Sequence, residues 1–99
     1  MPGSNAFKNS FPKALKTLRA VRHVNQEAFG LVSSRTYISS LERGIRTPTL
    51  KKIDEISTVL DVHPLTLLLL SYVDEVSTTS IDEIIDVVRH QALDICNSG

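Results

Sequence analysis

The sequence predicts a small all-α protein, and three observations lead to this prediction. Apolar residues recur at spacings of three and four along most of the chain, strand-like alternation is weak throughout, and helix-capping residues precede the apolar runs. A chain of 99 residues holds one domain, or one domain with an appended element. No internal repeat or low-complexity tract interrupts the pattern.

The chain is expected to begin with a flexible arm over residues 1–10. The first helix starts at Phe11, because Ser10 and Pro12 form a start signal there. Lysine and arginine side chains alternate with its apolar positions, so its outer face is basic. The apolar positions are Phe11, Ala14, Leu15, Leu18 and Val21.

Two short helices are predicted to follow in close succession. Asn25 caps the second helix, which covers about residues 26–31. Either Ser33 or Ser34 caps the third helix, which runs to about Glu42. The inward-facing residues of the two helices are Phe29, Tyr37, Ile38 and Leu41.

Three further helices are predicted in the second half of the chain. Thr49, or Thr47 with Pro48 in the first turn, opens the fourth helix, and Pro64 opens the fifth. The sixth helix begins at a capping box, the sequence SIDE at residues 80–83. The apolar positions are Leu50, Ile53, Ile56 and Leu60 in the fourth helix, and Ile81, Ile84, Ile85, Val88, Ala92 and Ile95 in the sixth.

The net charge of zero hides an asymmetry along the chain. Residues 1–52 carry ten Lys and Arg against two acids, whereas residues 53–99 carry one Arg against nine acids. A polyanion interacts with the local field rather than with the total charge. The first half is therefore a candidate electrostatic footprint for nucleic acid, the alternative being an ordinary solvated surface.

Other classes of function find little support in the sequence. The longest apolar run, residues 67–70, is far shorter than the ~20 residues that span a bilayer, and the N-terminus lacks the apolar stretch of a signal peptide. Cys96 is the single cysteine, which fits a reducing cytoplasm. We expect no metal site, because His23, His63 and His90 lie on different predicted elements. Without a nucleophile motif or a Gly-rich phosphate loop, neither an enzyme nor a cofactor is expected.

Residues 25–46, NQEAFGLVSSRTYISSLERGIR, are the most informative stretch. Two short helices joined by a tight turn need small or apolar inner faces, so their polar residues face outward. The outer face of the third helix then carries side chains that can contact base edges or phosphates: Arg35, Thr36, Ser39, Ser40 and Arg43. The N-terminal residues of such a helix enter the major groove first.

Residues 11–71 resemble the Xre/Cro family of helix-turn-helix regulators, which have a lambda-repressor-like DNA-binding domain. The matching motifs occur in order: QE at residues 26–27, SRTYIS at 34–39, LERG at 41–44 and TPTL at 47–50. The resemblance implies a five-helix DNA-binding domain over residues 11–72. Residues 73–99 then form an added C-terminal helical extension, a possible dimerisation element.

The resemblance also implies DNA-binding roles for individual residues. Base-facing positions are matched by Arg35, Thr36 and Ser40. Backbone-contacting positions are matched by Tyr37, Arg43 and Arg46. Positions that bond phosphate and support or cap the reading helix, which is the third helix, are matched by Asn25, Gln26 and Ser34. Arg35 is the candidate for bidentate contact with a guanine. Two alternatives stay open: Tyr37 as a partly buried core residue, and Glu42 paired with Arg43 or with a neighbouring helix.

The chain departs from the family pattern between Phe29 and Ser34, where it is two residues shorter. This difference removes about half a turn from the second helix. Gly30 stands where alanine is usual, which predicts a closer approach of the two helices.

Together these features predict a sequence-specific DNA-binding transcriptional regulator, by preference a repressor, that binds a palindromic operator as a homodimer. The fifth helix and the apolar stripe of the sixth are expected to form the dimer surface. Alternatively, the sixth helix folds back over the leucines of its own protomer. The size resembles that of phage-type repressors, controller proteins of restriction–modification systems and antitoxins. The rival hypothesis is a protein-interaction module whose acidic C-terminal half binds a protein partner such as a toxin.

Overall fold

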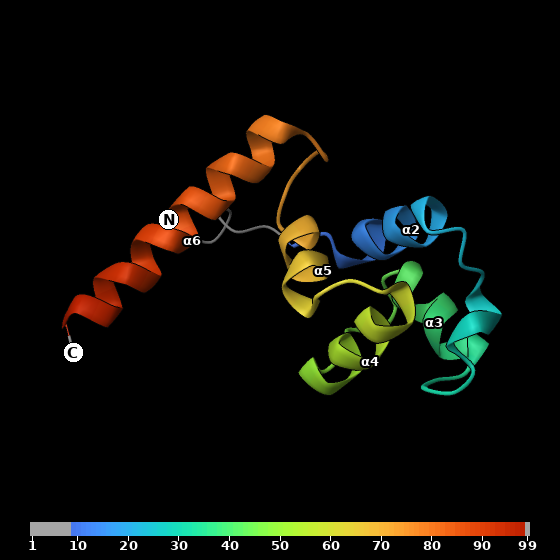
Figure 1. The fold of residues 1–99 in the computed structure, drawn as a ribbon. Coiled ribbons are helices and arrows are strands. Elements are labelled where there is room, and N and C mark those ends of the chain that lie inside the picture. The colour runs from blue at the N-terminus through green and yellow to red at the C-terminus, as the bar shows by residue number, and fades with distance from the viewer. Residues whose placement is uncertain (1–8, 99) are drawn as a thin grey trace.

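A computed structural model describes residues 9–98, which form five α-helices and one 3₁₀ helix (Figure 1). The elements are α2 (Phe11–Val21), η1 (Gln26–Phe29), α3 (Arg35–Glu42), α4 (Leu50–Leu60), α5 (Pro64–Ser71) and α6 (Thr78–Ser98). Because residues 9–98 contain no strand, the all-α prediction is confirmed. The first five elements gather around one centre, and α6 projects away from them (Figure 1).

Residues 11–71 enclose a single apolar core, because each of their helices has an apolar face at helical spacing. α2 lies beside α3 and α5, and α4 packs against α5 and η1. Val21 and Leu50, which were predicted to face the core, are exposed because they lie at the last and first positions of their helices. The most deeply buried apolar side chains are Leu15, Phe29, Ile38, Leu41, Ile56, Leu60 and Leu67.

Side-chain caps begin three of these elements as predicted. Asn25 Oδ1 accepts a hydrogen bond from the Ala28 N–H at 3.0 Å. Ser34 Oγ accepts from the Tyr37 N–H at 3.1 Å, and Thr49 Oγ1 accepts from the Lys52 N–H at 3.2 Å. Of the alternatives left open by the sequence, Ser34 therefore caps α3 and Thr49 caps α4.

The second helix is shorter than predicted, since η1 ends at Phe29 instead of near residue 31. Phe29 is fully buried, and the chain turns immediately after it. The Gly30 N–H donates to the Glu27 carbonyl oxygen at 3.0 Å, which closes a tight 3₁₀ turn. A Cβ on Gly30 would lie 3.3 Å from the same oxygen. Glycine therefore relieves crowding within its own turn, whereas the sequence had suggested contact with a neighbouring helix.

The predicted N-terminal arm falls largely outside the described residues, because residues 1–8 are not among them. Its last two residues are bound to the end of α5. Asn9 Nδ2 donates to Ser71 Oγ at 2.9 Å, and the Ser10 N–H donates to the Ser71 carbonyl oxygen at 2.5 Å. Asn9 and Ser10 are thus part of the folded domain.

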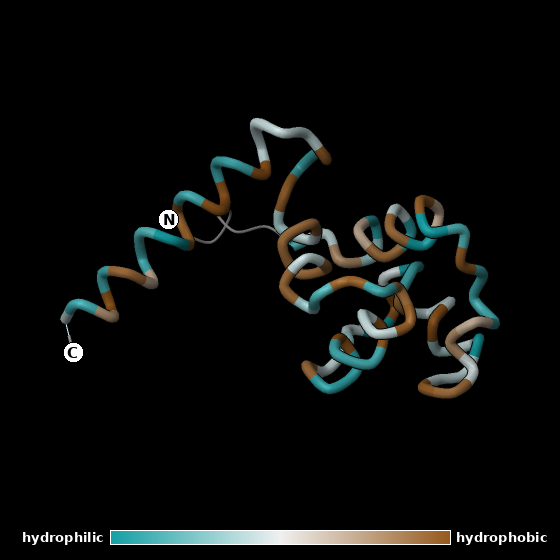
Figure 2. The backbone as a smooth tube through the Cα atoms, viewed as in Figure 1, coloured by the Kyte–Doolittle hydropathy of each residue, from teal (hydrophilic) through white to brown (hydrophobic). Residues whose placement is uncertain are grey.

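α6 begins at Thr78, earlier than the predicted capping box. Ser77 provides the cap in place of Ser80, because its Oγ accepts from the Ser80 N–H at 3.2 Å. α6 packs against α5, yet none of its residues is buried, and apolar segments alternate with polar ones along its exposed length (Figure 2). Within residues 9–98, no helix combines the length and hydropathy that crossing a membrane requires.

Candidate nucleic-acid interface

α3 is held by its inner face and presents its first turn to solvent. Ile38 and Leu41 are completely buried, whereas Ser34, Arg35 and Thr36 are exposed. Side chains of a helix tilt toward its N-terminus, so the exposed residues of the first turn project beyond the end of α3. A reading helix enters the major groove with this end.

A partly buried ion-pair network fixes the orientation of α3. Arg19 of α2 donates to both carboxylate oxygens of Glu42, from Nε to Oε2 at 2.5 Å and from Nη2 to Oε1 at 2.9 Å. Gln26 of η1 donates from Nε2 to Glu42 Oε1 at 3.1 Å. Glu42 is buried, and a buried carboxylate needs such partners. The network therefore joins α2, η1 and α3 at one point.

The pairing with Glu42 favours the charged form of Arg19. The hydrogen bond to Glu42 raises the pKa of Arg19 above its ordinary value, and the charge of Glu42 adds to this effect while burial opposes it. Of the alternatives left open by the sequence, Glu42 thus pairs with a neighbouring helix and not with Arg43. Gln26 lies where the resemblance placed a residue that supports the reading helix.

A lysine of α4 holds the turn between η1 and α3. Lys52 Nζ donates to the Val32 carbonyl oxygen and lies 5.7 Å from the centre of the Tyr37 ring. It also pairs with Glu55 at 3.2 Å. Tyr37 is half-buried and packs against the core. The role of Lys52 could not be predicted from the sequence, because its partner carbonyl lies twenty residues earlier in the chain.

Ser40, predicted to face a base, is not on the exposed surface. Its side chain is only 5% exposed, and its Oγ donates to the Tyr37 carbonyl oxygen at 2.6 Å. After α3, the N–H groups of Ile45 and Arg46 both donate to the Ser40 carbonyl oxygen, which closes the turn that follows the helix. Ser40 therefore does not lie on the exposed face of α3, where the sequence had placed it. Ser39, one turn after Arg35, is half-buried and lies on the exposed side.

Arg35 forms an exposed ion pair with Glu27 of η1, with 3.3 Å between Nη1 and Oε1. Both side chains are more than two-thirds exposed. Such a pair contributes little free energy, so a ligand can draw the guanidinium away at low cost. A small polar hollow lies beside this pair, lined by Arg19, Asn25, Gln26, Glu27 and Arg35.

Two more arginines lie at the opposite end of α3. Arg43 is the C-terminal cap residue, is exposed, and donates from Nε to the Ser39 carbonyl oxygen at 3.4 Å. Gly44 follows with φ of 73°, a conformation that favours glycine and turns the chain sharply. Arg46, after this turn, is also exposed. Exposed guanidinium groups thus lie at both ends of α3.

Comparison with protein families gives one match. Residues 15–67 match a family model described as Helix-turn-helix, a range that runs from α2 into α5 and includes η1 and α3. Comparison with curated proteins and with solved structures found no match. Because the family match covers more than half of the 99 residues, the chain belongs to the Xre/lambda-repressor-like family of helix-turn-helix DNA-binding regulators.

Proposed function

We propose that this protein is a transcriptional repressor that binds a two-fold symmetric operator as a homodimer, with α3 as the reading helix. One observation carries the proposal: the first turn of α3 is exposed while the Arg19–Glu42–Gln26 network holds the helix in place. A reading helix that is oriented before DNA arrives loses little conformational freedom on binding.

Arg35 is the residue that we assign to direct base contact. Its guanidinium can donate two hydrogen bonds to the O6 and N7 atoms of a guanine in the major groove. Thr36, beside it on the first turn, contacts the neighbouring base pair. The residues that we assign to the DNA backbone are Asn25, Gln26, Ser34, Tyr37, Arg43 and Arg46.

A two-fold operator follows from the size of the reading surface. One α3 reaches the bases of a single half-site, and a dimer brings a second α3 to the next turn of the groove, about 34 Å away. A dimer bound in this way covers its operator and blocks other proteins from the same DNA, which is the simplest route to repression.

The test begins with an operator selected from random duplexes with the full-length protein. Arg35→Ala should weaken binding to that operator by ~1–3 kcal/mol in a mobility-shift assay and relax preference at one base pair of each half-site. Arg35→Lys is the matched control, because it keeps the positive charge but loses the planar guanidinium group that donates two hydrogen bonds to guanine. It should lose the base preference and retain nonspecific affinity. Arg35→Ala binding as tightly as the unmodified protein would exclude this role.

A second measurement separates backbone contacts from base contacts. If the basic first half faces DNA, the logarithm of affinity should fall linearly with the logarithm of salt concentration, by ~0.9 for each phosphate neutralised. Arg43→Ala should reduce this slope by about one and leave the selected sequence unchanged. An affinity for DNA that does not change with salt concentration would contradict the assignment of these residues to the DNA backbone.

The charge asymmetry supports a second candidate function, a module that binds a basic protein. The second half of the chain carries nine acids and one arginine. Under this alternative the acidic half would be the functional surface, and a duplex selection would yield no preferred sequence. That outcome separates the two functions.

A further inference from the structure

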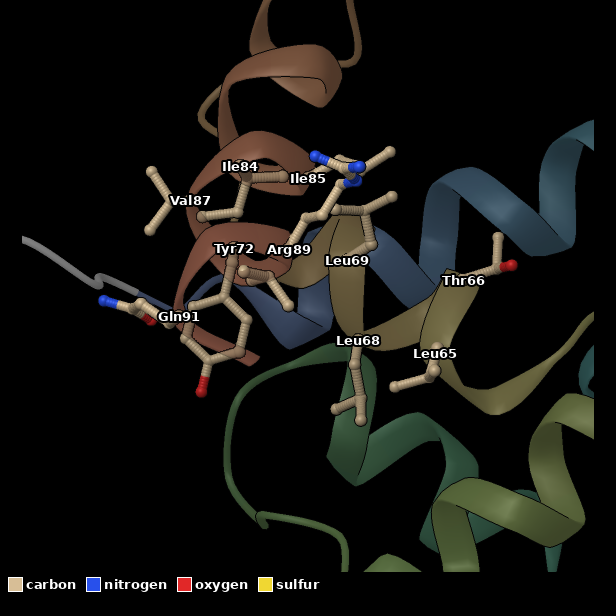
Figure 3. A pocket seen from close by; sticks show the side chains of 11 residues that line it. Leu65, Thr66, Leu68, Leu69, Tyr72, Ile84, Ile85, Val87, Arg89 and Gln91 are labelled. Carbon is tan, nitrogen blue, oxygen red and sulfur yellow. The ribbon is translucent and has the colours of Figure 1, made fainter. Parts of the chain in front are cut away.

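An apolar groove of about 690 Å³ lies between α5 and α6 and opens to solvent. Figure 3 shows the aliphatic side chains of the two helices around it. α5 contributes Leu65, Leu68 and Leu69, and α6 contributes Ile84, Ile85 and Val88. An exposed apolar surface of this kind marks an interaction site in a protein that otherwise buries its core.

α6 continues this apolar surface along its length. It is 21 residues long, which corresponds to ~31 Å of helix, and none of its residues is buried. Ile85 is 46% exposed and Ile95 is 73% exposed. α6 packs against α5, and Ile81 and Ile84 are its only half-buried apolar residues.

The spacing of the apolar residues on α6 is that of a coiled-coil seam. Ile81, Ile85, Val88, Ala92 and Ile95 follow one another at alternating steps of four and three. Two charged residues flank this seam, and one of them, Arg89, also lines the groove. They are Asp82 and Arg89, and they lie one heptad apart. The remaining acids of α6 lie on its outer surface, away from the seam: Glu83, Asp86 and Asp94.

We propose that a second copy of this chain occupies the groove, with its α6 antiparallel to the first. This inference deepens the proposed homodimer, because it names the surface through which the two copies meet. In the antiparallel register, Ile81 lies opposite Ala92 of the second copy and Ile85 lies opposite its Val88. Large and small residues then face each other across the seam.

The charges favour this occupant and this direction. The antiparallel register places Asp82 of each copy beside Arg89 of the other, so two ion pairs form by symmetry. A parallel register would align the acidic N-terminal halves of the two helices and give neither pair. A basic partner would meet only one acid on this flank of the seam, Asp82. Arg89, one heptad away, would repel such a partner. The seam is therefore complementary to itself.

The experiment is a charge exchange, measured by sedimentation velocity at micromolar concentration without DNA. Asp82→Arg alone or Arg89→Asp alone places like charges together twice, and each should raise the Kd of the dimer at least about tenfold. An equimolar mixture of the two variants should form a heterodimer with nearly the original Kd, because both pairs are then restored. Both positions are exposed, so the fold of the domain should be unaffected.

Glu83→Arg and His90→Asp are the matched controls, because they change charge one residue further along, on the outer surface. Both should dimerise like the unmodified chain. A monomeric unmodified chain would overturn the proposal, as would single variants that still dimerise or a mixture that stays monomeric. The measurement needs no DNA, so a dimer that fails to select a duplex would contradict the proposed function alone. Single variants that still dimerise and still select a two-fold operator would contradict this interface alone.

Discussion

The domain of residues 11–71 and helix α6 use the same kinds of apolar residue with opposite outcomes. In the domain, isoleucines and leucines at helical spacing are buried, and α2, η1, α3, α4 and α5 each supply part of the enclosure. In α6, equally apolar residues at similar spacing remain in solvent. The apolar pattern of a helix therefore predicts that its apolar face will be buried against another surface. The pattern does not predict whether that surface belongs to the same chain or to another molecule.

The largest expected effect compares one substitution in both regions. Leu60 in α4 is 1% exposed and Leu93 in α6 is 45% exposed. Leu60→Ala should lower the free energy of unfolding by ~2–5 kcal/mol, because it leaves a cavity in a closed core. Leu93→Ala should change it by less than about 0.5 kcal/mol, because Leu93 lies outside both the core and the seam. Urea denaturation monitored by circular dichroism measures both, and equal losses would remove the distinction between the regions.

The turns of the domain provide the next effect. Among residues 9–98, the positive-φ residues all lie between helices of the domain: His23, Gly44 and Asp61. Gly44→Ala should cost ~1–2 kcal/mol, since its Cβ would enter a left-handed conformation although the nearest atom, Cγ of Pro12, is at an ordinary 3.7 Å. Gly44→Asn, which tolerates that conformation better, should cost less. Equal melting temperatures for all three proteins would contradict this account.

Removing α6 should have a smaller effect on stability than Leu60→Ala or Gly44→Ala. A chain that ends after Ser77 keeps the buried Val73 and loses no buried side chain. At concentrations where both chains are monomeric, its free energy of unfolding should change by less than about 1 kcal/mol. Sedimentation should show that it no longer dimerises. A truncated chain that is unfolded by circular dichroism would mean that α6 belongs to the domain core.

The smallest effect concerns the exposed pair between Arg35 and Glu27. Glu27→Gln should leave stability within about 0.5 kcal/mol, because exposed ion pairs contribute little. It should strengthen operator binding by roughly two- to fivefold, since it frees Arg35 and removes a negative charge beside the DNA. Fluorescence anisotropy with labelled operator measures the change. Asp94→Asn in α6 removes the same charge far from α3 and should not alter affinity; a matching gain there would contradict a local effect.

The features of this fold that could be predicted from the sequence are those that depend on neighbouring residues. The order of the helices and the caps at Asn25 and Thr49 depend on residues within one turn of each other, so sequence spacing suffices. The Arg19–Glu42 pair joins residues that are far apart in sequence and became visible only when α2 and α3 were packed together. The length of the second helix was wrong because tertiary burial of Phe29 ended it early.

In the candidate interface too, local spacing predicted some features, whereas tertiary packing determined others. Helical spacing correctly left Arg35, Thr36 and Arg43 exposed, and their contact with DNA remains a prediction. The same spacing placed Ser40 on the outer face of α3, whereas the packed domain buries its side chain. Lys52 was missed for a related reason, since its role depends on a backbone carbonyl in a distant turn.

The position of Glu42 has a consequence for how this surface can evolve. Stability of α3 depends on its inner residues and on the network around Glu42, whereas Arg35, Thr36 and Ser39 contribute little to holding the helix in place. If α3 reads the operator as proposed, mutations at those three positions would change operator preference without loss of folding. Exchanging these side chains between relatives would transfer one operator preference to another scaffold. Regulators that arise by gene duplication could diverge by this route in a few substitutions.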